Sequence, residues 1–199
     1  MRRLFVSLSF AAALTVGAFG VSAPALAQQL SEEAVAARMK AQKEALAPLA
    51  RMDGEWRGTA WIADRTGKRT VLVQTERVGD MLDGTVKVIE GRGFEDGKPV
   101  FNAFAQISFD PDKKTMTMRS YTRGMQGDFP IAATADGFIW TIPAGPNAVI
   151  RYTAVIKDGI WVEKGEYVPN GGQGMRFMEM TLKRVGDTKW PAEGGLGPK

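Results

Sequence analysis

Turn-forming sequences divide the chain from Gly54 onward into short segments, and this spacing constrains the fold more than any other feature. The runs between the turns are rich in β-branched and aromatic residues, as in 85–89 and 138–142. None of the segments is long enough for the crossover helix that parallel strands need. We therefore predict an all-β fold, an antiparallel up-and-down (lipocalin-like) barrel of about ten strands, because closing the sheet removes its exposed edges. The nine turn signals are Thr66-Gly67, Gly79-Asp80, Asp96-Gly97, Asp110-Pro111-Asp112, Gly127-Asp128, Asp136-Gly137, Pro143 to Asn147, Asp158-Gly159 and Asn170-Gly171-Gly172.

The first strand opens with the pattern Gly54-x-Trp56-x-Gly58. Gly54 allows a tight turn out of the segment before it. Trp56 is expected to bury its ring across one end of the barrel, with its indole N–H reaching a backbone carbonyl. Gly58 would let a neighbouring segment approach closely. These three residues are the predicted structural anchor of the domain.

A single amphipathic helix is predicted before the barrel, within residues 28–52. Ser31 is a good N-cap, and two glutamates follow in the first turn, where the helix dipole favours them. An apolar stripe then recurs at spacings of three and four residues. We expect the stripe to pack on the barrel; the alternative is a partner surface or a lid. Its members are Val35, Met39, Gln42, Leu46 and Leu49.

Residues 1–27 have the three parts of a Sec-type secretory signal peptide. A basic start with Arg2 and Arg3 precedes an apolar core, and the small-residue motif Ala25-Leu26-Ala27 follows. An uncleaved membrane anchor is the alternative. Cleavage after Ala27 would give a periplasmic or secreted protein that is not inserted in a membrane. The barrel is expected over residues 53–185, and a mobile tail over 186–199, in which Trp190 either covers an opening or is loosely held.

The composition excludes several classes of function. The chain has 199 residues with no cysteine and no histidine, so it lacks a disulfide, a thiol nucleophile and the usual zinc ligand, haem ligand and general base. We therefore expect no catalytic residues, no metal and no cofactor. The formal charge is +4 and becomes +2 once Arg2 and Arg3 are removed, and without a basic cluster this does not suggest nucleic-acid binding.

Several ordered motifs resemble one bacterial family. They are Leu49 to Gly58, Ser108 to Lys114, Ile150-Arg151-Tyr152, Trp161 to Glu166, Gly171-Gly172 and Phe177-Met178-Glu179. Together they resemble the domain of unknown function 1579 proteins, over roughly residues 46–184. The resemblance implies an exported, lipocalin-like barrel with no assigned activity. Haem-binding nitrobindins are also similar in outline but use a histidine ligand, so haem is not carried over to this chain.

The hairpin around Asp158-Gly159 allows a count of faces. A two-residue turn pairs Lys157 with Ile160, which places Arg151 opposite Glu166 and Tyr152 opposite Gly165. One face carries Ile150, Tyr152, Ile156, Trp161, Glu163 and Tyr167; the other carries Val149, Arg151, Thr153, Val155, Val162, Glu166 and Val168. Both are largely apolar, so the sequence leaves open which is inside. Arg151 and Glu166 are either a buried polar anchor for a ligand or an exposed cross-strand ion pair.

A second candidate anchor is Arg119-x-Tyr121, whose guanidinium and phenol share one face of a strand and could hold a carboxylate. Arg119 has no predicted partner, so we expect it, rather than Arg151, to accept an anionic ligand. Tyr152 and Trp140 complete the candidate ligand-binding residues. Glu163 and Glu179 could also face each other like a glycosidase pair, an interpretation that we rank far lower.

Two functions follow. The first is an exported barrel that binds a small hydrophobic or amphipathic, possibly anionic, molecule. The second is an envelope-associated protein-interaction module with a filled core and no ligand, because small barrels can be solid or hollow. The sequence does not indicate the ligand or the oligomeric state.

Overall fold

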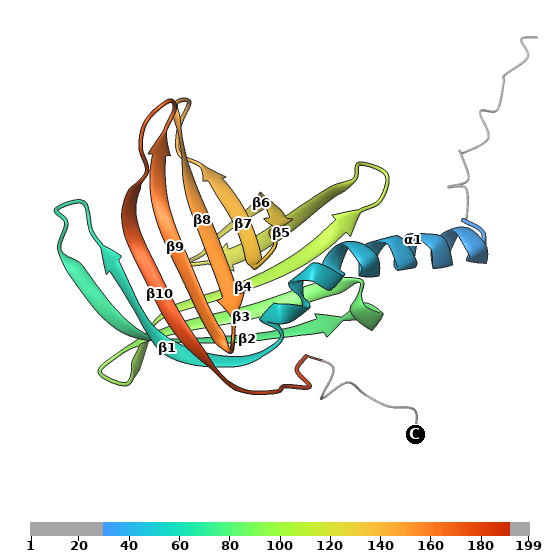
Figure 1. The fold of residues 1–199 in the computed structure, drawn as a ribbon, viewed down its shortest axis with the longest axis horizontal. Helices are drawn as coiled ribbons and strands as arrows, with labels where there is room; N and C mark the ends of the chain where they lie inside the picture. Colours follow the sequence, from blue (N-terminus) through green and yellow to red (C-terminus); the bar gives the residue numbers. More distant parts are fainter. Residues whose placement is uncertain (1–29, 192–199) are drawn as a thin grey trace, which may run out of the picture. The chain divides into compact units, whose positions relative to one another are not determined.

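The computed structural model describes residues 30–191, so the predicted signal peptide at 1–27 and positions 192–199 of the predicted tail lie outside the described residues. Over these residues the chain forms one α-helix, two 3-10 segments and ten strands (Figure 1). They are α1 (Glu32–Leu46), η1 (Ala47–Met52), β1 (Gly54–Ala63), β2 (Arg69–Met81), η2 (Leu82–Gly84), β3 (Val86–Glu95), β4 (Lys98–Asp110), β5 (Thr115–Thr122), β6 (Met125–Ala133), β7 (Gly137–Pro143), β8 (Ala148–Lys157), β9 (Ile160–Pro169) and β10 (Met175–Gly186).

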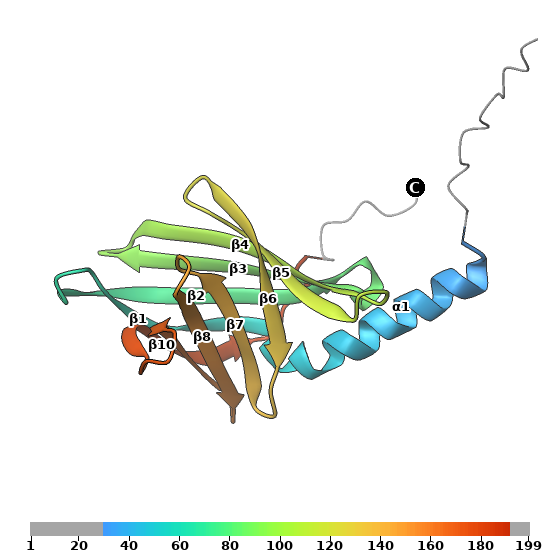
Figure 2. The ribbon, with the colours of Figure 1, turned by 90° about the horizontal axis from the view of Figure 1, so that it is seen from above.

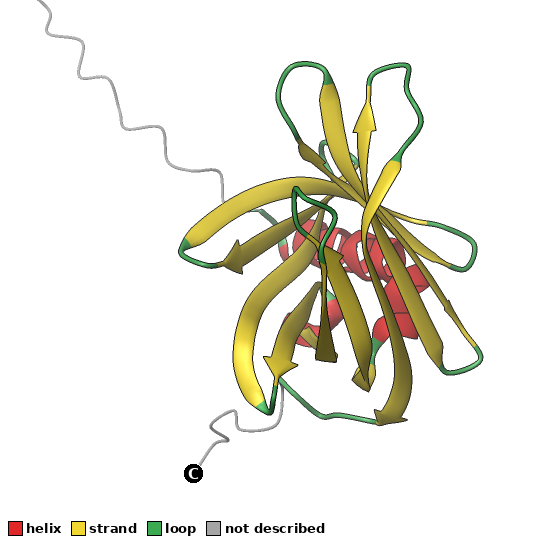
Figure 3. Ribbon diagram, turned by 90° about the vertical axis from the view of Figure 1, so that its left-hand side faces the viewer, coloured by secondary structure: helices red, strands yellow, loops and turns green. Residues whose placement is uncertain are grey.

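The ten strands close into an antiparallel barrel in which each pairs with its neighbours in sequence and β10 pairs with β1. Figure 2 shows the strands from above, and Figure 3 shows the ring end-on. The predicted fold class, an antiparallel barrel of ten strands after one N-terminal helix, is confirmed.

Two of the nine predicted turns are wrong by a few residues. The turn expected at Gly79-Asp80 lies at η2, and the one expected at Gly127-Asp128 lies at Arg123-Gly124. Both misassigned glycines sit inside strands, where the absence of a side chain makes room for a neighbour. A Cβ on Gly79 would lie 2.0 Å from the Trp190 carbonyl oxygen, and one on Gly127 would lie 2.5 Å from the Phe129 ring.

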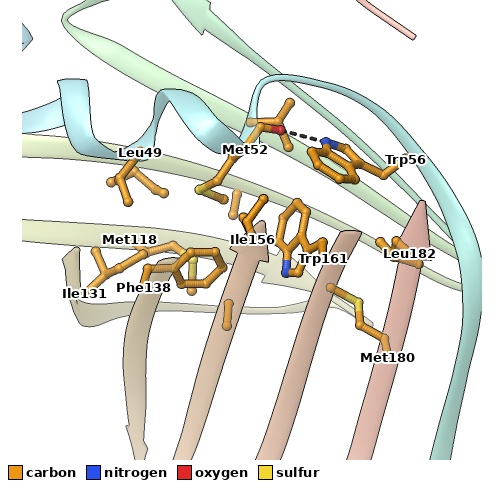
Figure 4. Packing of buried hydrophobic residues seen from close by; sticks show 14 of the residues in the cluster. Leu49, Met52, Trp56, Met118, Ile131, Phe138, Ile156, Trp161, Met180 and Leu182 are labelled. Carbon is orange, nitrogen blue, oxygen red and sulfur yellow. Dashed lines mark hydrogen bonds between the residues drawn. The ribbon is translucent and has the colours of Figure 1, made fainter. Parts of the chain in front are cut away.

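The segment η1 closes one end of the barrel. Leu49 and Met52 are fully buried there, and the Trp56 indole Nε1–H donates to the Met52 carbonyl at 2.8 Å (Figure 4). The Trp56 ring meets the Trp161 ring edge-on, with 5.6 Å between the ring centroids. The Phe138 ring also meets the Trp161 ring edge-on, at 5.7 Å. This aromatic packing fills the closed end of the barrel.

The expected helix stripe is buried only at its C-terminal end. Leu46 is buried, whereas Val35 is 42% exposed. Polar contacts hold the rest of α1 against the turns of the closed end: Arg38 pairs with Asp112 at 2.7 Å and Lys43 pairs with Asp83 at 3.0 Å. None of the helices within residues 30–191 is long and apolar enough to cross a membrane.

A buried lysine joins the closed end to the barrel wall. Lys87 is 1% exposed, and its Nζ bonds to the carboxylates of Asp53 and Asp80. Burying an ammonium group is costly unless it is paired, and two partners meet that need. Near the same end the Arg77 guanidinium lies over the Trp190 ring, 4.5 Å from the ring centroid. This part of the predicted tail therefore folds back on the outer wall of β2.

Candidate functional site

The pairing of β8 with β9 settles which face of this hairpin is inside. Arg151 pairs with Glu166 and Tyr152 with Gly165, so the register counted from the two-residue turn is confirmed. Trp161, Glu163 and Ala154 are buried on the face that also carries Tyr152. That face therefore lines the interior, and the valine face lies outside.

Arg151 and Glu166 form an ion pair on the outer wall. Their Nη2 and Oε2 atoms lie 2.9 Å apart, and both side chains are partly exposed. Of the two alternatives that the sequence left open, the structure shows the cross-strand pair rather than the buried anchor. An exposed pair of this kind adds about 0.2–1 kcal/mol.

The expectation that Arg119 is an inward-facing arginine without a partner is wrong. Arg119 pairs across the strands with Gln106 and Asp128, while the alternating positions Ile107 and Met118 are buried. The guanidinium donates to both carboxylate oxygens of Asp128, at 2.6 and 2.5 Å. This bidentate pair lies on the outer wall with Tyr121, which is 38% exposed.

A buried carboxyl group, that of Glu163 on β9, lies at the centre of the interior. The side chain is 6% exposed, and each of its oxygens accepts an indole N–H: Oε1 from Trp140 at 3.0 Å and Oε2 from Trp161 at 3.2 Å. Burial raises the pKa of Glu163 to about 7, and the two indole donors oppose this shift. Glu163 therefore exchanges its proton near neutral pH.

Glu76 on β2 is the second interior carboxyl group. Glu76 lies opposite Trp56 of β1 in the β1–β2 ladder. Its carboxylate accepts a hydrogen bond from the Gln74 side-chain amide at 2.7 Å. Burial is the main cause that raises the pKa of Glu76 to about 8; the carboxylates of Glu163 and Glu90 act in the same direction, and the Gln74 bond opposes the shift. Gly91 opposite it has no side chain, because a Cβ there would lie 2.8 Å from both Glu76 oxygens.

An aromatic wall stands beside Glu163. Trp140 and Tyr152 stack in parallel with their ring centroids 4.1 Å apart, and Phe177 meets Tyr152 edge-on at 6.1 Å. Burial and the Glu163 carboxylate together raise the pKa of Tyr152 to about 12. The two predicted site residues that face inward, Trp140 and Tyr152, are thus brought together.

Inward-facing residues at the end of the barrel opposite η1 are more exposed than those at the η1 end, and we call this end the open rim. Strand β1 runs away from η1, so the loops after β1, β3, β5, β7 and β9 all lie at this far end (Figure 3). Ile62 and Tyr167 follow the inward alternation of their strands and are each 38% exposed, unlike the buried residues at the η1 end. Trp140, Tyr152 and Glu76, deeper in the barrel, also keep some accessible surface.

The structure corrects the glycosidase-like pair and adds residues that the sequence interpretation missed. Glu163 pairs with Met180 in β10, whereas Glu179 pairs with Lys164 on the outer wall. Glu76 takes the place of Glu179 as the second interior carboxyl. The signal for it was present, because Leu72, Gln74, Glu76 and Val78 alternate along one strand face. Within residues 30–191 no group of three or more acidic side chains is placed to hold a metal ion.

The structural anchor residues lie at the start of β1. Gly54 has φ of +120°, a conformation that favours glycine. At Gly58 a Cβ would lie 2.0 Å from the Thr181 carbonyl oxygen, so β10 approaches β1 closely at this point. Trp56 faces inward between them and is 2% exposed.

These features define a small, closed up-and-down β-barrel with two carboxyl groups inside. No protein-family model and no curated protein matches the chain. Among solved structures the chain is similar to the crystal structure of Rv2717c from M. tuberculosis, with a TM-score of 0.50 and 12% identity, covering 70% of this chain and 96% of that chain. At that identity the similarity concerns the fold alone.

Proposed function

We propose that the protein binds a small, partly apolar molecule inside the barrel, with the polar end of the ligand at Glu163 and Glu76. The observation that carries the proposal is the buried Glu163 carboxyl group, held by two indole donors beside the Trp140–Tyr152 stack. Apolar walls with a few fixed polar groups are typical of small-molecule sites.

The charges inside the barrel favour a ligand that donates hydrogen bonds or carries a positive charge. Arg119 and Arg151 both lie on the outer wall. The buried Lys87 is already paired with Asp53 and Asp80 at the closed end. An amine would meet two carboxyl groups and the face of an aromatic stack, which attracts cations. The anionic ligand considered from the sequence loses its anchor, because that anchor was Arg119.

A matched ligand panel tests this proposal. Dodecylamine, dodecanol and dodecanoic acid share one chain and differ in the head group. We expect the amine to bind at least tenfold more tightly than the acid at pH 7.5, and Glu163→Gln to remove that preference. Glu166→Gln is the control, because it changes the same residue type on the outer face of the same strand.

Binding of an amine should also release protons, since the cation favours the ionised form of both carboxyl groups. Calorimetry in two buffers of different ionisation enthalpy measures this release. Equal affinity for all three ligands would overturn the placement of the polar end of the ligand at Glu163 and Glu76. Binding of none of them would overturn the proposal and favour the second candidate, an interaction module with a filled core.

We further propose export to the periplasm or the medium, on the basis of the signal-like pattern at residues 1–27. Membership of the domain of unknown function 1579 family is a proposal as well, resting on the ordered motifs of the sequence. Small-molecule analysis by native mass spectrometry of protein from its own host would test the carrier role directly.

A further inference from the structure

One seam of the barrel wall is paired over a much shorter length than the others. Strands β6 and β7 pair only through residues 131–133 and 138–140, whereas every other neighbouring pair of strands is paired over at least six residues. The first part of β6, from Met125 to Phe129, pairs with β5 but not with β7. The wall is therefore weakest at this seam.

Pro130 accounts for the point at which the ladder stops. The Thr134 N–H donates to the Gly137 carbonyl at 2.9 Å. Because hydrogen-bonded pairs alternate along an antiparallel ladder, residues 132 and 139 form the next such pair, followed by 130 and 141. Pro130 has no N–H to donate to Thr141. The last rung is thus incomplete, and the strands can separate from there toward Ile131 and Trp140.

The inner side of the seam is covered by two aromatic rings, one from each strand. Phe129 of β6 and Trp140 of β7 lie 5.8 Å apart, tilted at 49°. The Phe129 ring rests over Gly127 of its own strand, in space that any side chain at 127 would fill. Trp140 in turn bonds to Glu163 and stacks on Tyr152. Separation of β6 from β7 therefore opens directly onto the candidate site.

We propose that the ligand reaches the interior through this seam, with Phe129 as the side chain that covers the opening. The inference rests on the proposed function, because it assigns an access route to that same site. Opening requires β6 to unpair from β7 beyond Pro130, beginning at Ile131 and Trp140, and the Phe129 ring to move off Trp140. The rest of the wall stays closed, since each of its other ladders holds at least six pairs of residues.

A reversible lock across the seam tests the route, and the absence of native cysteine makes the design simple. Cysteines replace Ala132 and Ile139, an outward pair within the short β6–β7 ladder. Their Cα atoms should lie within disulfide range because hydrogen-bonded antiparallel pairs are about 5.5 Å apart. The reduced form of the same protein is the reference. The control lock joins cysteines at Thr153 and Lys164, an outward pair in the continuous β8–β9 ladder.

The first readout needs no ligand. Exchange of the Trp140 indole proton with solvent, followed by NMR, reports how often water reaches Glu163. We expect oxidation of the seam lock to slow this exchange at least tenfold, and oxidation of the control lock to change it less than twofold. Phe129→Ala, which removes the cover, should speed it. An unchanged rate with the seam locked would overturn the proposal and assign access to the open rim.

The second readout is the association rate of dodecylamine. With the seam locked it should fall at least tenfold, while the equilibrium affinity changes less than threefold. If wild-type protein binds no amine but the lock still slows indole exchange, the proposed function fails and the opening seam stands. If the amine binds with an unchanged rate and the exchange is also unchanged, the seam fails and the proposed function stands.

Discussion

The substitution Glu163→Gln should remove most of the loss of stability that wild-type protein shows between pH 5 and 8. In the folded protein the pKa of this carboxyl is about 7, against 4.5 as its ordinary value. Between these values the folded state holds a proton that the unfolded chain has lost, so stability falls as pH rises. The contribution is complete below pH 4.5 and is lost as pH rises through about 7. A shift of this size corresponds to about 3 kcal/mol in all, of which roughly 2.5 kcal/mol is lost between pH 5 and 8.

Glutamine at position 163 removes that loss at a fixed cost. The carboxyl accepts from Trp140 and Trp161 through separate oxygens, and an amide offers only one. Leaving one buried indole N–H without an acceptor costs about 1–2 kcal/mol. At pH 5 the variant should therefore be less stable than wild type by about 1 kcal/mol, and at pH 8 more stable by a similar amount.

Urea denaturation at pH 5, 6, 7 and 8, followed by circular dichroism, measures how the free energy of unfolding changes with pH in wild type and in Glu163→Gln. Glu166→Gln should run parallel to wild type, because that residue is partly exposed in an outer ion pair. Parallel curves for wild type and Glu163→Gln would show that Glu163 is ionised throughout this range, and would refute the argument from burial.

Three further outcomes are expected. Trp56→Ala should cost about 3–5 kcal/mol in chemical denaturation, because it empties the closed end and leaves the Met52 carbonyl without its donor; a loss under about 1 kcal/mol would contradict this role. Arg119→Gln should change stability by less than about 1 kcal/mol and leave ligand affinity unchanged, since its pair with Asp128 is exposed; a measurable loss of binding would return it to the site. Sequencing of the exported protein should find Gln28 at its N-terminus, and an intact Met1 would exclude cleavage.

The fold was predictable because its signals are local. Turn residues and period-two alternation require only neighbouring positions, and antiparallel order follows from the lack of crossovers. The β8–β9 register was correct because Asp158 and Gly159 form a two-residue turn with φ of 52° and 71°. Loops of this length fix the pairing of every residue that follows.

The error over Arg119 followed from the misplaced turn. With Gly127-Asp128 interpreted as a turn, Asp128 was not available as a strand residue, and Arg119 had no visible partner. The true two-residue turn at Arg123-Gly124 pairs Thr122 with Met125, and counting outward then places Arg119 opposite Asp128. Glycine alone does not distinguish the two cases, since it serves both positive φ and close packing.

The interior chemistry depends on the length of one loop, which local signals do not fix. A two-residue turn at Thr66-Gly67 would pair Trp56 with Arg77 and turn a different set of β2 side chains inward. The structure has a three-residue loop instead: the Asp64 N–H donates to the Lys68 carbonyl, and Gly67 has φ of +84°.

That one additional residue pairs Trp56 with Glu76. Because Trp56 faces inward, Glu76 and Gln74 do so as well, and Arg77 lies outside with its partner Glu90. The Asp64 carboxylate stabilises this loop by accepting from the N–H groups of Thr66 and Lys68. Glu76 lies seven residues beyond Arg69, the first residue of β2. The length of a loop at the open rim thus determines whether the barrel presents an acid or an arginine to its contents.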